Sequence, residues 1–123
     1  MRDNREWKKV LLERVSNFAM NIIRLSDKLP KSPAGFAIAS QVIRSATSIG
    51  ANIVEAQDAS SIKDFTHKLS ISLREARETS YWLTVIKKAT LLNESEIEKD
   101  IKECDELIAI LVTSIKSSKA KFI

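Results

Sequence analysis

Residues 97–115, IEKDIKECDELIAILVTSI, decide the fold class of this chain. Apolar side chains recur in this stretch at intervals that alternate between four and three residues, at Ile97, Ile101, Cys104, Ile108, Leu111 and Ile115. This spacing places them on one side of an α-helix and is the rhythm of helices that pack in bundles. We therefore expect a helix over about residues 96–117 whose apolar side faces other helices.

Three earlier segments show the same kind of apolar periodicity, and they predict helices over about residues 4–28, 33–58 and 62–92. The expected inward residues are Val10, Leu11, Val15, Phe18, Ile22, Leu25 and Leu29, then Ile38, Val42, Ala46, Ile49, Ile53 and Ala56, then Ile62, Phe65, Leu69, Leu73, Ala76, Leu83 and Ile86 or Lys87. Helices joined by short connections pack as antiparallel neighbours. The predicted fold is one all-α domain over residues 1–123, an antiparallel up-down-up-down four-helix bundle.

The connections carry recognisable start and stop signals. Pro30 ends the first helix, and Ser32 followed by Pro33 is typical of an N-cap with proline at the first helical position. Capping boxes are expected where Ser61 is followed by Asp64 and where Ser95 is followed by Glu98. Gly50 lies inside the second helix, where we expect it to be tolerated without a structural need.

Composition bounds the class of protein. Glycine and proline occur twice each in 123 residues, which is too few for the many turns of an all-β fold. The single cysteine allows no internal disulfide, and no segment approaches the roughly 18 uninterrupted apolar residues of a membrane span. The N-terminal residues lack the apolar run of a signal peptide. These features favour a cytoplasmic location.

Residues that could support catalysis are scarce. His67 is the only histidine, so one subunit cannot build a multi-histidine metal site, and we expect His67 at the surface or rim. Cys104 lies on the apolar side of the last helix and should behave as a small hydrophobe. No phosphate-binding glycine loop, CxxC pair or HExxH run occurs. We predict no catalytic residues, no metal, no cofactor and no enzymatic activity.

A second stripe on each of the two middle helices suggests contact surfaces. The second helix carries short polar groups three or four residues apart, at Gln41, Arg44, Ser45, Ser48, Asn52 and Glu55. Such groups suit a partly buried contact in which hydrogen bonds are completed. The third helix carries Ile71, Glu75, Glu78, Trp82 and Val85 opposite its core side. We interpret both stripes as subunit contacts, with Arg44 pairing with Glu75 or Glu78; the alternative is an internal polar layer in a monomer.

Basic residues point to an anionic partner. The net charge is +4, and the basic excess is concentrated over residues 2–28 and 63–88. On a further side of the third helix lie Lys63, Arg74, Arg77, Tyr81 and Lys88. Cations with an interleaved aromatic ring can follow phosphates and stack a base. The alternative is an ordinary solvated face.

Two segments carry a resemblance to a known family. QVIRSATSIGANIVEA (residues 41–56) and KDFTHKLSISLREARETSYWL (residues 63–83), together with the upstream Leu29 and Pro30, resemble the bacterial four helix bundle proteins, also called 23S ribosomal RNA intervening-sequence proteins. The shared pattern is RSxxSIxxNIxE, followed by Asp64, Phe65, Leu69, Ser72, Glu75 and Leu83. After Glu55 the chain departs from the pattern, since Ala56, Gln57 and Asp58 stand where the family has glycine and often a basic residue.

The resemblance implies a non-enzymatic four-helix bundle that assembles into a barrel-shaped homopentamer. A related branch of the family is the accessory protein of diversity-generating retroelements, which implies RNA or DNA and a reverse transcriptase as partners. Our leading hypothesis is a homo-oligomeric scaffold, a pentamer, that binds RNA or DNA with weak sequence specificity. The alternative is a structural or protein-interaction module that binds no nucleic acid.

Overall fold

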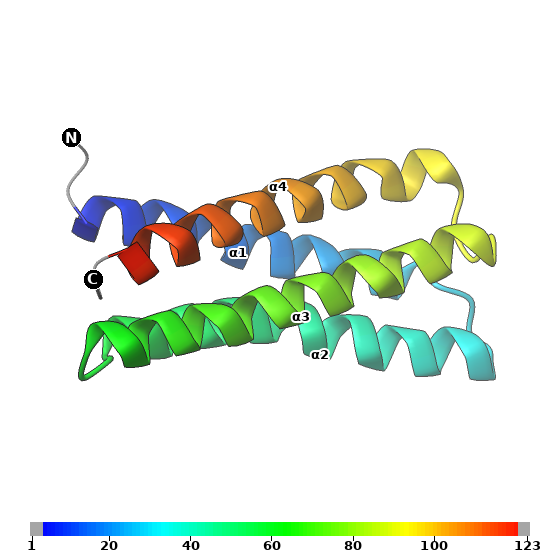
Figure 1. Ribbon diagram of the computed structural model, residues 1–123. Coiled ribbons are helices and arrows are strands. Elements are labelled where there is room, and N and C mark those ends of the chain that lie inside the picture. The colour runs from blue at the N-terminus through cyan, green and yellow to red at the C-terminus, as the bar shows by residue number, and fades with distance from the viewer. Residues whose placement is uncertain (1–3, 121–123) are drawn as a thin grey trace.

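The computed structural model describes residues 4–120 and shows four helices in this range: α1 (Asn4–Asp27), α2 (Pro33–Gln57), α3 (Ile62–Lys88) and α4 (Glu94–Lys119). Consecutive helices run in opposite directions and are joined by short connections (Figure 1). The α2–α3 connection lies at the same end of the bundle as the start of α1 and the end of α4. The predicted all-α four-helix bundle is confirmed, while residues 1–3 and 121–123 of the predicted domain lie outside the described range.

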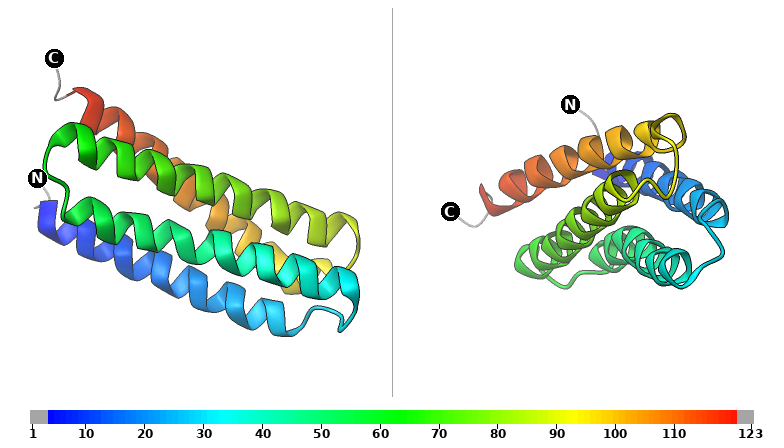
Figure 2. Two further views of the ribbon diagram at one scale, coloured as in Figure 1. Left: turned by 90° about the horizontal axis from the view of Figure 1, so that it is seen from below. Right: turned by 90° about the vertical axis from the view of Figure 1, so that its right-hand side faces the viewer.

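Each helix packs against two neighbours around one core. α2 contacts α1 and α3, α4 contacts α3 and α1, and the contact between α1 and α4 is the least extensive (Figure 2). The buried residues of the core include Val15, Phe18, Ile22, Val42, Ile49, Leu69, Leu83, Ile86, Ile97, Leu107 and Leu111. Removal of these side chains from water is the main force that holds the bundle together.

The inward sides differ from the predicted ones at a few positions. Val10 and Ile62 were expected inside but are exposed. Val10 is rotated by about 100° from Leu11, which takes it out of the arc that faces the core. In α4, Leu107 is fully buried whereas the predicted Ile108 is only half-buried, because α4 meets both α1 and α3 and buries an arc wider than one stripe.

The starts of α2 and α3 follow the predicted caps. The Ser32 hydroxyl accepts a hydrogen bond from the Gly35 amide at 3.1 Å, and Pro33 occupies the first turn. The Ser61 hydroxyl accepts from the Asp64 amide at 3.0 Å, but the Asp64 carboxylate accepts from the Ser60 amide at 3.2 Å and not from the Ser61 amide, so only the serine half of the predicted box is present. These bonds satisfy amides that have no partner within the helix.

The end of α3 and the start of α4 differ from the prediction. α3 ends at Lys88, before the predicted residue 92, because Thr90 adopts a left-handed conformation with φ 55°. The Leu91 amide then donates to the Ile86 carbonyl at 3.0 Å, which closes the helix with a Schellman-type turn. α4 is capped by Asn93, whose amide donates to Glu96 Oε1 at 3.1 Å, so the predicted Ser95–Glu98 box is wrong by two residues.

The glycines of α2 have different surroundings. A Cβ atom on Gly35 would lie 1.8 Å from the Pro30 carbonyl oxygen, so glycine is required where the connection folds over the start of α2. A Cβ atom on Gly50 would lie 3.4 Å from Val15 Cγ2, which is an ordinary contact. The expectation that Gly50 is tolerated without a structural need agrees with this geometry.

Buried hydroxyl groups join α2 to α3. The Thr79 hydroxyl donates to Ser45 Oγ at 2.8 Å, and the Ser72 hydroxyl donates to the Ile49 carbonyl at 2.8 Å. All three hydroxyl-bearing side chains are fully buried. The predicted subunit contact is therefore wrong for Ser45, because its side chain is already covered by α3 of the same chain.

Candidate functional site

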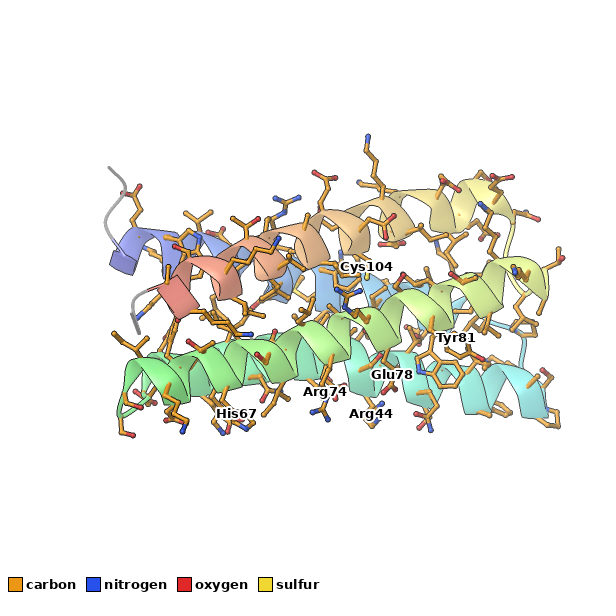
Figure 3. All side chains as sticks on the ribbon, viewed as in Figure 1. Arg44, His67, Arg74, Glu78, Tyr81 and Cys104 are labelled. Carbon is orange, nitrogen blue, oxygen red and sulfur yellow. The ribbon has the colours of Figure 1, made fainter. Side chains whose placement is uncertain are left out.

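The outer side of α3 brings the predicted nucleic-acid-binding residues onto one helix surface. Lys63, Arg74, Arg77, Tyr81 and Lys88 are all exposed, at spacings that keep them within one broad arc of the helix. His67 is exposed on the same arc, as expected for a surface residue. Figure 3 shows His67, Arg74 and Tyr81 along this edge of α3. We call this surface the α3 outer face.

The cations of the α3 outer face have no acidic partner among the described residues. The ion pairs among the described residues involve other cations: Arg14 with Glu103 and Glu106, Arg44 with Glu75 and Glu78, Lys68 with Glu55, and Lys87 with Glu94 and Glu98. The glutamates of these pairs are thus engaged by other cations, whereas Asp105 of α4, which lines a hollow with Arg77, takes part in none of them. The charge of the α3 outer face is left available to an external anion.

A chain of contacts fixes the aromatic part of this surface. The Tyr81 ring packs edge-on against Trp82, with 5.1 Å between ring centroids, and 59% of Tyr81 is exposed. Trp82 Nε1 donates a hydrogen bond to Glu78 Oε2 at 3.0 Å. The same oxygen pairs with Arg44 of α2. Tyr81 is therefore an exposed ring held against a fixed neighbour.

The acid in this chain of contacts is kept ionised. The pKa of the Glu78 carboxyl lies below its ordinary value, first because the Trp82 indole donates to it and then because Arg44 does, while burial opposes the shift. Arg44 also pairs with Glu75 at 3.2 Å and keeps 48% of its side chain exposed. The predicted partners of Arg44 are thus correct, but the pairs lie within one chain.

The two predicted contact stripes face each other along the α2–α3 seam. On α3, the residues Ile71, Glu75, Glu78, Trp82 and Val85 are half-buried. On α2, Gln41, Arg44 and Glu55 are exposed, and Ser48 and Asn52 are half-buried with hydrogen bonds to the carbonyls of Arg44 and Ser48. Apart from Ser45, these residues keep some surface open, and their role between subunits stays a prediction.

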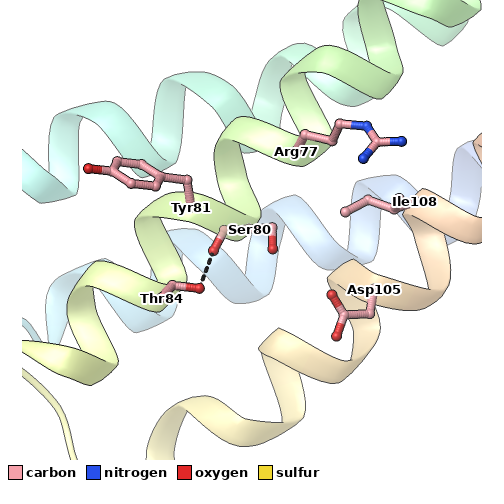
Figure 4. A pocket seen from close by; sticks show the side chains of 6 residues that line it. All are labelled: Arg77, Ser80, Tyr81, Thr84, Asp105 and Ile108. Carbon is pink, nitrogen blue, oxygen red and sulfur yellow. Dashed lines mark hydrogen bonds between the residues drawn. The ribbon is translucent and has the colours of Figure 1, made fainter.

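A shallow hollow flanks the α3 outer face on the α4 side. It is lined by Arg77, Ser80, Tyr81, Thr84, Asp105 and Ile108 (Figure 4). The Thr84 hydroxyl donates to the Ser80 carbonyl at 3.0 Å, while the Tyr81 ring points away from α4. Arg77 and Tyr81 are therefore the members of the α3 outer face that also line this hollow.

The remaining groups that could react are buried or dispersed. Cys104 is fully buried as predicted, and burial raises the pKa of its thiol to about 12. Among residues 4–120 no cluster of histidine, cysteine and acidic side chains is arranged to hold a metal ion. None of the described helices has the length and apolarity that a membrane crossing requires.

The sequence reasoning missed one clamp between the first and last helices. Arg14 Nε and Nη2 donate to the two carboxylate oxygens of Glu103, each at 2.8 Å, and Nη2 also reaches Glu106 at 3.2 Å. These pairs hold α1 against α4, where the helix contact is least extensive. Nothing in the local pattern links residues so far apart in the chain.

Comparisons with other proteins place the chain in a family. Residues 8–113 match the sequence profile of the 23S rRNA-intervening sequence protein. A similar solved structure is a protein of unknown function from the S23 ribosomal protein family of Bacteroides thetaiotaomicron, with 36% identity, a TM-score of 0.81, and coverage of 86% of this chain and 98% of that chain. No curated protein matches the chain. With the four-helix fold and the resemblance of its central segments, the chain belongs to the 23S rRNA-intervening sequence protein family.

Proposed function

We propose that this protein is a non-enzymatic, homo-oligomeric scaffold, a pentamer, that binds RNA or DNA with weak sequence specificity through the α3 outer face. The observation that carries the nucleic-acid part is a set of four exposed cations, Lys63, Arg74, Arg77 and Lys88, which lack an acidic partner among the described residues. The oligomeric part rests on the family resemblance.

The length of the α3 outer face suits a polymeric anion. At about 1.5 Å per residue, Lys63 and Lys88 are separated by roughly 37 Å along the helix axis. Successive phosphates on one DNA strand are about 3.4 Å apart along the duplex axis, so this length spans many of them. Lysine and arginine bind phosphates without reading the bases, which accounts for weak sequence specificity.

Tyr81 gives the same surface a means of binding unpaired bases. An exposed ring next to cations can stack a base, and each stacked base contributes about 1 to 3 kcal/mol. The ring is packed against Trp82, which limits the freedom that it would lose on binding. We therefore expect single strands to depend on Tyr81 more than duplexes do.

The test removes two cations of the α3 outer face and compares them with two removed elsewhere. The double variant Arg74→Ala/Arg77→Ala should bind single-stranded RNA and duplex DNA more weakly than the parent does. The matched control, Lys102→Ala/Lys116→Ala, makes the same charge change at exposed positions of α4. Binding is measured by fluorescence anisotropy at two salt concentrations.

The salt dependence separates phosphate contacts from a general charge effect. Log affinity should fall with log salt by about 0.9 per phosphate contact on duplex DNA and about 0.7 on single strands, and only the α3 variant should flatten this slope. A parent that binds no nucleic acid at low salt would refute the proposal. An equal loss in both double variants would show that net charge, and not the α3 outer face, is responsible.

A further inference from the structure

α2 differs from the other helices in its lack of charge. Arg44 and Glu55 are the only charged residues between Pro33 and Gln57, whereas α1, α3 and α4 each carry at least eight. A helix without charge around most of its circumference is normally buried on most sides. In the single chain, however, α2 is covered only by α1, α3 and the core.

The uncovered side of α2 has the pattern of a helix-packing surface. Its residues follow one another at intervals of three or four: Phe36, Ser40, Ile43, Thr47, Ala51 and Val54. Phe36 is 64% exposed and Val54 is 46% exposed. Small residues between these apolar ones allow another helix to come close. We call this surface the α2 outer face.

A second uncharged surface lies on α1. Between Arg14 and Arg24 this helix has no charged residue, and Met20 is exposed by 47% in that stretch. Ser16, Asn17, Asn21 and Ile23 are exposed there too. Four of the seven large apolar residues that the described chain exposes, Val10, Met20, Ile23 and Phe36, precede residue 40, and a fifth, Val54, lies on the α2 outer face.

We infer that a second copy of this chain covers the α2 outer face and contacts it with the uncharged stretch of its α1, residues 15–23. The lack of charge on both surfaces favours a second copy as the partner. A nucleic acid would need cations, and the only cation of α2, Arg44, is already paired with Glu75 and Glu78. A helix with charged contact residues would bury them without partners, which is costly.

A contact between two different surfaces of one chain is the kind that can build a ring. Such a contact repeats from copy to copy and closes when the rotation permits. The inference rests on the proposed homo-oligomer and names the surfaces that build it. It moves the subunit contact from the polar stripe beside α3, where Arg44 and Glu55 are engaged within the chain, to the uncharged sides of α1 and α2.

The test places one charge on each surface. Thr47→Lys on the α2 outer face and Met20→Lys on α1 change residues that are exposed in the single chain, so the bundle itself should still fold. We expect light scattering of either variant at micromolar concentration to give the monomer mass of 13.8 kDa. The control Thr113→Lys, at an exposed position of α4, should keep the mass of the parent.

The outcomes separate this inference from the proposal on which it rests. If the parent itself is a monomer, the homo-oligomer is refuted. If the parent is an oligomer and either Thr47→Lys or Met20→Lys keeps its mass, the inferred contact is refuted. Circular dichroism monitors folding, and Phe36→Ser provides a variant without added charge; it should weaken association several-fold, and unchanged association would count against the contact.

Discussion

Replacement of Gly35 by alanine tests the tightest backbone contact in the structure. The new Cβ atom would lie 1.8 Å from the Pro30 carbonyl oxygen and 2.9 Å from its carbonyl carbon. Both atoms belong to the backbone, and an ordinary contact begins near 3.4 Å, so the connection must move by about 1.6 Å. Leu29, which precedes Pro30, is buried in the core and resists this movement.

The expected loss follows from two opposing effects. Overpacking of this kind costs about 1 to 3 kcal/mol or more, and alanine in place of glycine in a helix returns at most about 1 kcal/mol. We expect Gly35→Ala to lower the free energy of unfolding by about 2 kcal/mol. For a chain of this size that corresponds to a fall in melting temperature of roughly 8 °C.

Gly50→Ala in the same helix is the matched control. Its Cβ atom would meet Val15 Cγ2 at 3.4 Å, so only the propensity gain of about 1 kcal/mol remains and the melting temperature should rise by roughly 4 °C. Both variants are melted by circular dichroism at one protein concentration, because association shifts apparent stability. A Gly35→Ala variant that melts at or above the parent would refute the reasoning.

Three further predictions concern the α3–α4 turn and two titrating groups. Thr90→Gly should stabilise the protein by about 1 kcal/mol in urea unfolding, because Thr90 is β-branched and left-handed with φ 55°; no gain would mean that the turn is unstrained. Glu78 has a lowered pKa in the folded state, so its contribution is present above the ordinary carboxyl pKa and is lost as pH falls through the folded value. Trp82→Phe removes the indole hydrogen bond that lowers this pKa and should therefore reduce the loss of stability in acid. An unchanged dependence of the free energy of unfolding on pH in acid would contradict this. Because the Cys104 thiol has a pKa of about 12 in the folded state, its contribution to stability should be lost as pH rises from the ordinary thiol pKa towards 12, and Cys104→Ala should lack this loss. The native thiol should also resist alkylation at neutral pH.

The sequence predicted what depends on local periodicity and capping. The helices could be predicted from the apolar spacing of Ile97 to Ile115 and from the start signal at Ser32 and Pro33. Both signals depend only on residues within a few positions of one another. The α3 terminus could not be read in the same way, since Thr90 is not a residue that usually marks a left-handed turn.

Contacts between residues far apart in the chain were harder to predict from the sequence. Arg44 was matched with the correct acids, but pattern alone cannot tell a partner in the same chain from one in another copy. Thr79 and Ser72 were not expected in the core, because their burial depends on hydrogen-bond acceptors on α2, namely Ser45 Oγ and the Ile49 carbonyl. The Gly35–Pro30 contact likewise depends on how the connection folds back.

The buried hydroxyl hydrogen bonds between α2 and α3 fix the register of the two helices. Sliding or turning α3 against α2 would break the Thr79–Ser45 bond and leave the Ser72 hydroxyl without its Ile49 partner, and a stranded buried group costs about 1 to 3 kcal/mol. Ser45 and Thr79 would keep carbonyl partners in their own helices. The α2 and α3 outer faces are therefore held at one fixed angle to each other. In a ring built through α1 and α2, every copy would present its α3 cations in the same orientation, so that the ring would carry identical, evenly spaced cationic surfaces.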